Sequence, residues 1–180
     1  MTTRFNRRDR EGVLHFVTLR VREGRRAFSR DAYARAVLNQ LRRQCDEFPA
    51  RLIAYVAMPT HLHCIVNPRG GRLNHFLGQY KAGCTLDLCR LAEEAGDLRV
   101  LDWLYQTPDH HAQLFQDGKH SFHLYSDRLI WQKINYIHNN PTRSGLVTRA
   151  NEYPYSGFCA MYPADGESVV PLDAGFWWED

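Results

Sequence analysis

The sequence predicts an α+β fold of the ferredoxin-like kind: a β-α-β-β-α-β core with an antiparallel sheet, followed by an additional C-terminal helix. Three observations predict it: runs of β-branched and aromatic residues, two segments with helical apolar spacing between those runs, and turn residues at their borders. With 180 residues, 44% of them hydrophobic, the chain has the size of one domain and enough apolar residues to bury a core. This fold class hosts many activities, so it decides nothing about function alone.

The first half of the chain is expected to hold three strands and one helix. "VLHFVTLRV" at 13–21 is rich in β-branched and aromatic residues and predicts the first strand. A helix is expected from Asp31 to Phe48, where apolar residues recur at i, i+3, i+4 and i+7. "RLIAYVAM" at 51–58 is apolar on both faces and predicts a central strand, and the Pro59–Thr60 turn leads into "HLHCIVN" at 61–67.

The middle of the chain is harder to interpret. The "PRGGR" break ends the third strand, and a second long helix is predicted from about Leu73 to Glu94. Residues 96–125 are rich in turn formers and hold two short strand candidates, at 114–115 and 121–124. One of these is expected to complete the sheet.

Charge is distributed unevenly along the chain. Residues 1–43 contain twelve arginines against four acids, whereas residues 165–180 contain five acids and neither Lys nor Arg. A basic front end suggests a polyanionic partner, and the alternative is a solvated charged face. We therefore expect a folded domain over residues 1–162 and an acidic C-terminal tail over residues 163–180.

Cysteine usage and hydropathy indicate a cytoplasmic protein with no membrane partner. The five cysteines form no CxxC pair, so reduced thiols are expected. The N-terminus has no apolar signal core, and the longest apolar run, at 52–58, is too short to cross a bilayer.

Two histidines flank one leucine in "MPTHLHCIV". In a strand, His61 and His63 point to the same face, and Leu62 and Cys64 point to the other. Two neighbouring imidazoles can hold a divalent cation, and the alternative is a half-buried pair with satisfied hydrogen bonds. H-x-H recurs by chance, so a metal site also needs a third ligand.

The third helix offers a third ligand and a nucleophile. Ser126 or Asp127 caps this helix, and it is expected to stop at Pro141, with irregular chain beyond it. Tyr136 and Asn140 are one turn apart on one face, so a phenolate and an amide oxygen can act at the same place. The alternatives are an amphipathic tyrosine at the core rim and a helix C-cap before proline.

Four stretches together resemble a known family. "MPTHLHCIVNP" resembles the histidine–hydrophobe–histidine strand of single-tyrosine HUH transposases. "YIHNNPTRSGLV" resembles the tyrosine helix of the REP-associated tyrosine transposases of bacteria, where REP denotes a repeated extragenic palindrome. The connecting "GKHSFHLYSDRLIWQKI" and the trailing "NEYPYSGFCAMY" also fit that subgroup, so the resemblance covers about residues 10–162.

The resemblance implies a metal-dependent transposase that cleaves and rejoins single-stranded DNA at palindromic or hairpin repeats. It implies His61 and His63 as metal ligands, Asn140 as the third ligand, and Mg²⁺ or Mn²⁺ as the cofactor. It implies Tyr136 as the nucleophile that forms a 5′-phosphotyrosine intermediate. Thr60 departs from the asparagine usual in the family, without removing a catalytic group.

Several basic residues are expected to contact single-stranded or hairpin DNA. Lys81 and His120 match residues frequent in the subgroup, and Lys81 is expected at a phosphate. The other basic residues come from the arginine-rich front end: Arg7, Arg8, Arg22 and Arg25. The sequence leaves open whether the protein is a monomer or a homodimer.

Three rival functions remain open at this point. The first is a catalytically silent protein that binds DNA hairpins through the same fold. The second is a water-using metal phosphodiesterase, which needs acidic residues that do not accompany His61, His63 or Tyr136 in sequence. The third is an RNA-binding module, for which "VLHFVTLRV" is a weak aromatic strand candidate.

Overall fold

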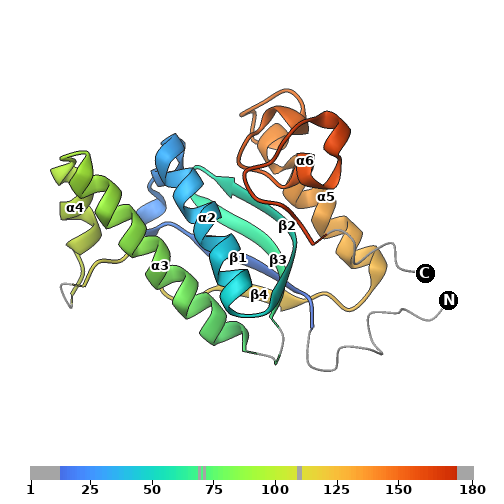
Figure 1. The fold of residues 1–180 in the computed structure, drawn as a ribbon, viewed down its shortest axis with the longest axis horizontal. Helices are drawn as coiled ribbons and strands as arrows, with labels where there is room; N and C mark the ends of the chain where they lie inside the picture. Colours follow the sequence, from blue (N-terminus) through green and yellow to red (C-terminus); the bar gives the residue numbers. More distant parts are fainter. Residues whose placement is uncertain (1–12, 69, 71, 109–110, 174–180) are drawn as a thin grey trace.

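The structure, a computed structural model, describes residues 13–68, 70, 72–108 and 111–173. Figure 1 shows a twisted sheet with helices α2 and α3 in front of it and helix α5 behind it. Residues of the expected tail beyond 173 lie outside the described part of the chain.

The sheet has the predicted antiparallel ferredoxin-like arrangement. Its strands are β1 (His15–Arg20), β2 (Ala50–Met58), β3 (His61–Pro68) and β4 (His120–His123). They lie in the order β2-β3-β1-β4, and each neighbouring pair is antiparallel. With the two crossover helices, α2 (Asp31–Glu47) and α3 (Leu73–Glu94), the core reads β-α-β-β-α-β.

The remaining elements are short, apart from the tyrosine-bearing helix. Helix α5 spans Asp127–Arg143, α4 spans Leu98–Tyr105 and α6 spans Phe158–Met161. Within the fully described segments, single turns of 3₁₀-helix include η1 (Arg22–Gly24), η2 (Ala27–Ser29), η4 (Ala150–Glu152) and η5 (Pro163–Asp165).

Helix α4 corrects the expectation that residues 96–125 hold only turns and short strands. Asp97 caps it, because the Asp97 side chain accepts a hydrogen bond from the Val100 N–H. Trp103 and Leu104 are buried, and α4 packs along α3. An eight-residue helix is unstable alone, so this tertiary packing stabilises it.

Helix α5 also differs from the prediction at its end. The Ser126 side chain caps it by accepting a hydrogen bond from the Leu129 N–H, as expected. The helix continues through Pro141 to Arg143, three residues beyond the expected end at Asn140. Proline removes one N–H, but its fixed φ is helical, so the chain resumes hydrogen bonding with Ser144 N–H to Asn140 O.

The two faces of the sheet bury separate apolar clusters. Beneath α2 and α3, the strands contribute Val17, Leu19, Leu62, Cys64 and Val66. On the α5 face, Phe16 and Ile65 pack with three isoleucines of α5: Ile130, Ile134 and Ile137. The predicted alternation along β3 is therefore confirmed, since Leu62 and Cys64 enter the core and the histidines face α5.

The chain after α6 returns along the outer edge of β2. Val170 is buried, its N–H donates to Tyr55 Oη, and Tyr55 Oη donates to the Val170 carbonyl at 2.8 Å. Further along, the Leu52 N–H donates to the Asp173 carboxylate at 2.8 Å. The first part of the expected tail thus packs on the domain. Within the described residues, no helix has the length and apolar character needed to cross a bilayer.

Candidate active site

Strand β3 places both predicted histidine ligands on the α5 face of the sheet. The rings of His61 and His63 lie edge to face with centroids 4.6 Å apart. Each Nδ1 lies 2.9 Å from a threonine hydroxyl: Thr60 for His61 and Thr18 for His63. A hydroxyl can accept from Nδ1–H, and that tautomer leaves the Nε2 lone pair free. The two threonines thus fix both rings in an orientation suited to ligation through Nε2.

Burial keeps both imidazoles uncharged at neutral pH. Desolvation, with the charges of His61 and Arg20 next, lowers the pKa of His63 to about 3. Desolvation followed by the charge of Arg20 also lowers the pKa of His61. Neutral imidazole is the form that binds a metal ion.

Helix α5 brings Tyr136 and Asn140 to the same place. The Tyr136 ring centroid is 5.4 Å from that of His63. Asn140 is buried, and its Oδ1 accepts a hydrogen bond from the Ser144 hydroxyl at 3.4 Å. A cavity of about 370 Å³ is lined by all four predicted catalytic residues, His61, His63, Tyr136 and Asn140, together with Thr18 and Thr60.

A second cavity of about 720 Å³ shares His63 and Tyr136 with the first. Lys133 lies at its wall, with Nζ between 5.1 and 5.4 Å from the ring centroids of Phe16, Phe122 and Tyr136. Arg20 lines both cavities, and Asp117 lines the larger one. Three positive side chains, those of Arg20, Lys119 and Lys133, therefore line the larger cavity together with Tyr136, beside the carboxylate of Asp117.

The sequence reasoning missed Lys133 and Thr18. Lys133 precedes Tyr136 by three residues, so helical spacing could have placed it on the same face. Thr18 pairs with His63 across β1 and β3, which only the strand register reveals.

Two further predicted residues lie near the larger cavity. His120 lines it, from the position in β4 that pairs with Thr18. Lys81 does not line it; its Nζ donates to the carbonyls of Gln116, at 2.9 Å, and Gly118, at 2.5 Å. Lys81 thus secures the segment at the cavity rim.

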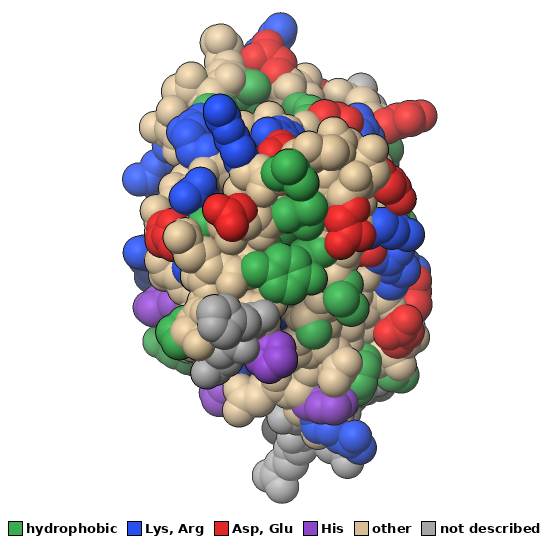
Figure 2. Space-filling model, turned by 90° about the vertical axis from the view of Figure 1, so that its left-hand side faces the viewer, with side chains coloured by type: hydrophobic (Ala, Val, Ile, Leu, Met, Phe, Trp, Pro, Cys, Tyr) green, Lys and Arg blue, Asp and Glu red, His purple; other side chains and the backbone are tan. Residues whose placement is uncertain are grey.

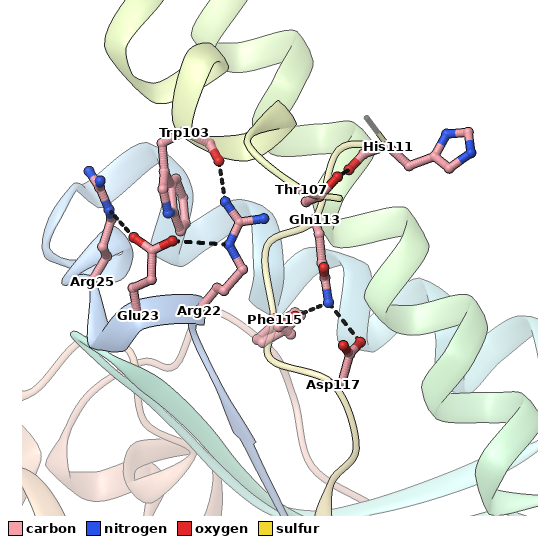
Figure 3. Close-up of polar contacts among 9 residues, drawn as sticks. All are labelled: Arg22, Glu23, Arg25, Trp103, Thr107, His111, Gln113, Phe115 and Asp117. Atoms are coloured by element: carbon pink, nitrogen blue, oxygen red, sulfur yellow. Dashed lines mark hydrogen bonds and ion pairs between the residues drawn. The ribbon is translucent and has the colours of Figure 1, made fainter. Parts of the chain in front are cut away.

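Arg22 and Arg25 contact Trp103 instead of lining either cavity. Figure 3 shows Arg22 beside the Trp103 ring, and the Arg22 guanidinium donates to the Trp103 carbonyl. Arg25 lies on the other side of Glu23, whose carboxylate is between the two arginines. The guanidinium carbons lie 5.4 and 5.1 Å from the Trp103 ring centroid. The structure therefore gives these arginines a role in fastening α4. Arg7 and Arg8 lie outside the described residues.

The face over α3 and α4 differs from the cavity surface. Figure 2 shows this face with a hydrophobic strip and with Lys and Arg interspersed among Asp and Glu. Leu86, Leu98 and Tyr105 are exposed on these two helices. On the described part of this face, Lys and Arg therefore alternate with Asp and Glu and do not form a continuous basic surface.

The donor set in the smaller cavity fits a divalent ion. It consists of two neutral imidazoles, each with its Nδ1 beside a threonine hydroxyl, and one amide oxygen. Among the residues that the structure describes, no three or more His, Cys, Asp or Glu side chains gather to hold a metal, so a carboxylate-rich centre is not found there. Three protein ligands would leave coordination positions open for a substrate oxygen and water.

No protein-family model matches the chain, and no curated protein matches it. Among solved structures, it is similar to a REP-associated tyrosine transposase bound to a REP hairpin, with 17% identity, a TM-score of 0.65 and coverage of 91% of each chain. A protein of Deinococcus radiodurans R1, provisionally assigned as a transposase, is 13% identical over 71% of this chain and 90% of its own, with a TM-score of 0.49. The chain therefore has the fold of a REP-associated tyrosine transposase, as its motifs predicted.

Proposed function

We propose that this protein is a DNA transposase that cleaves and rejoins single-stranded DNA through a covalent bond to Tyr136. The observation that carries the proposal is the single cavity lined by His61, His63, Tyr136 and Asn140. Metal-assisted phosphoryl transfer needs a nucleophile and a cation at the same phosphate, and the joint lining of this cavity by a tyrosine, two imidazoles and an amide supports that chemistry. The REP hairpin bound by the similar transposase supports hairpin DNA as the substrate class.

The reaction is a transesterification at phosphorus. The Tyr136 oxygen attacks in line, the bond from phosphorus to the 3′ oxygen breaks, and that oxygen takes up a proton as the phenol proton is lost. The product is a 5′-phosphotyrosine and a free 3′-hydroxyl. Attack by the same or another 3′-hydroxyl reverses the step, so the energy of the phosphodiester is conserved and no nucleotide is consumed.

The residues around Tyr136 divide the remaining tasks. His61, His63 and Asn140 would hold Mg²⁺ or Mn²⁺, which polarises the scissile phosphate and neutralises developing charge when bound. Phe16 packs against both rings, with its centroid 5.3 Å from that of His63 and 6.0 Å from that of Tyr136. Arg20 and Lys133 supply positive charge for neighbouring phosphates.

The test uses palindromic single strands labelled at the 5′ or the 3′ end, incubated with Mn²⁺ or EDTA. Products are resolved on a denaturing gel before and after protease treatment. We expect a metal-dependent protein–DNA adduct with wild type and none with Tyr136→Phe. Tyr125→Phe is the matched control, because Tyr125 is 72% exposed and lines neither cavity.

Two results would replace the proposal with a rival. DNA that is shifted but never cut, across many repeats, would identify the catalytically silent hairpin-binding protein. Cleavage that survives Tyr136→Phe would show that water or another residue is the nucleophile. If no protein–DNA adduct forms, water is the nucleophile, and Asp117 at the larger cavity is the first acid to test.

A further inference from the structure

A third cavity, of about 630 Å³, lies at the other side of strand β4. Its wall contains the start of α3, including Arg72, and residues of β1 and β4. Among the described residues it is lined by three histidines, two cationic side chains and no carboxylate: His15, Arg72, Leu73, Asn74, His75, Lys119, Ser121, Phe122 and His123. Such a lining favours an anion.

This cavity adjoins the cavity of about 720 Å³ at Tyr136, because the two share lining residues. Lys119 and Phe122 line both of them. Strand β4 is four residues long and forms the edge of the sheet, so an extended ligand can pass around it. Lys119 also donates a hydrogen bond to Asn74 Oδ1, which joins the start of α3 to the segment before β4.

The side chains in the third cavity match the parts of a nucleotide. Arg72 and Lys119 offer positive charge to a phosphate, and no ion pair engages either of them within the described residues. The rings of His15 and His123 lie edge to face with centroids 4.7 Å apart, and Phe122 and His75 add further planar surfaces. Planar side chains bind unpaired bases by stacking.

Two other ligands fit less well. A metal ion would need three converging ligands, and the three histidines do not form such a group among the described side chains. A protein segment would gain little from a wall of cations and imidazoles, since docking surfaces for proteins are depleted of charge at their centre.

We propose that this cavity binds an unpaired nucleotide of the strand that flanks the scissile phosphate, after the strand has passed around β4. The proposal rests on the proposed function for the identity of that strand. It assigns Arg72 and Lys119 to phosphates and the imidazole rings with Phe122 to the base.

The test measures binding with EDTA present, so that it is independent of cleavage. The probes are fluorescein-labelled DNA hairpins with zero, two, four or six unpaired thymidines on either side. Fluorescence anisotropy compares wild type with Arg72→Ala and His75→Ala, both exposed positions. The matched control is Arg99→Ala, an exposed arginine on α4 that lines none of the three cavities.

We expect wild type and Arg99→Ala to bind flanked hairpins about tenfold more tightly than blunt ones. Both cavity variants should lose that gain while binding blunt hairpins normally, and Arg72→Ala should reduce the salt slope by about 0.7. Iododeoxyuridine in the flank should crosslink to the peptide that contains His75, which lines this cavity and neither of the other two.

The proposal would be overturned if unpaired flanks tightened binding by the same factor in both cavity variants as in wild type. It would also be overturned if they did not tighten binding by wild type. An equal loss for blunt and flanked hairpins would overturn it as well. Failure of the Tyr136 adduct assay with an intact, variant-sensitive flank gain would instead count against the proposed chemistry and leave this binding site standing.

Discussion

One face of the sheet carries the candidate catalytic residues, and the other face packs the core beneath α2 and α3, although both faces use the same strands. On β3, Leu62 and Cys64 are almost completely buried beneath α2 and α3, whereas His61 and His63 face the cavity under α5. The side-chain period of a strand is two, so neighbouring residues take opposite tasks. Of two substitutions at adjacent positions of β3, one is therefore expected to lower activity and the other to lower the free energy of unfolding.

The largest expected effect is on the α5 face. His63→Leu keeps a side chain of similar size but removes the imidazole and leaves no atom that can ligate a metal ion. We expect adduct formation to fall by about 10³-fold or more, since metal-ion catalysis supplies several kcal/mol of transition-state stabilisation. The free energy of unfolding should change by less than about 1 kcal/mol. Adduct rates at saturating Mn²⁺ and urea unfolding curves measure the two quantities, and normal adduct formation would show that His63 is no ligand.

The neighbouring residue should behave in the opposite way. Leu62→Ala removes a fully buried side chain from the other face, so we expect it to lower the free energy of unfolding by about 2–5 kcal/mol. Adduct formation per folded molecule should be unchanged at temperatures where the variant is folded. A variant that is stable but slow would show that the two faces are coupled, against the division argued above.

A third variant tests how the histidine is held. Thr18→Val replaces the hydroxyl that lies 2.9 Å from His63 Nδ1 with a methyl group. Partners of this kind orient a ligand, and losing one weakens metal affinity by about 10–100-fold. Calorimetric titration with Mn²⁺ measures the affinity. Thr85→Val is a matched control on the opposite side of the sheet, where the Thr85 hydroxyl donates to the Lys81 carbonyl; an equal loss there would make the effect non-specific.

Two arginines of adjacent segments sharpen the contrast between the faces. Arg20 lines the catalytic cavities, whereas Arg22 is held at Trp103. Arg20→Gln should reduce the salt slope of single-strand binding by about 0.7 and leave stability unchanged. Arg22→Gln should cost about 1–2 kcal/mol of stability through lost contacts with Trp103 and leave the slope unchanged. The reverse pattern would support the prediction that Arg22 contacts DNA.

Local periodicity explains which parts of this division the sequence could predict. The alternation along β3 and the one-turn spacing of Tyr136 and Asn140 depend only on neighbours in the chain. They therefore predicted that the four candidates lie close together, and all four line one cavity.

Features that depend on distant partners were not predictable from the same patterns. Helix α4 requires burial of Trp103 and Leu104, and Arg22 lies 81 positions before the carbonyl that it contacts. Lys81 similarly reaches carbonyls 35 and 37 residues away. A basic residue in a basic stretch therefore says little about DNA contact until its tertiary partners are known.

The smallest expected effect lies at the rim of the α3 face, where His15 is half-buried. Desolvation, then the charges of His123 and Lys119, lower the pKa of His15 to about 4. Arg72 also lines this cavity, and among the described residues no carboxylate lines it to offset that charge.

The folded state therefore resists protonation of His15. An unfolded histidine titrates near its ordinary value of about 6.5, so the unfolded state binds the proton first as pH falls. Stability from this residue is complete above that pH and declines between about 6.5 and 4, by less than about 1 kcal/mol because partial exposure screens the cost.

Urea unfolding at pH 7, 6, 5 and 4.5 should show a shallower decline for His15→Gln than for wild type. The buried His63 contributes a decline of its own in both proteins, so only the difference between the two curves reports on His15. Parallel curves would mean that the rim is already hydrated enough to accept the charge. That result would place His15 on the hydrated side of the boundary between the core and the surface.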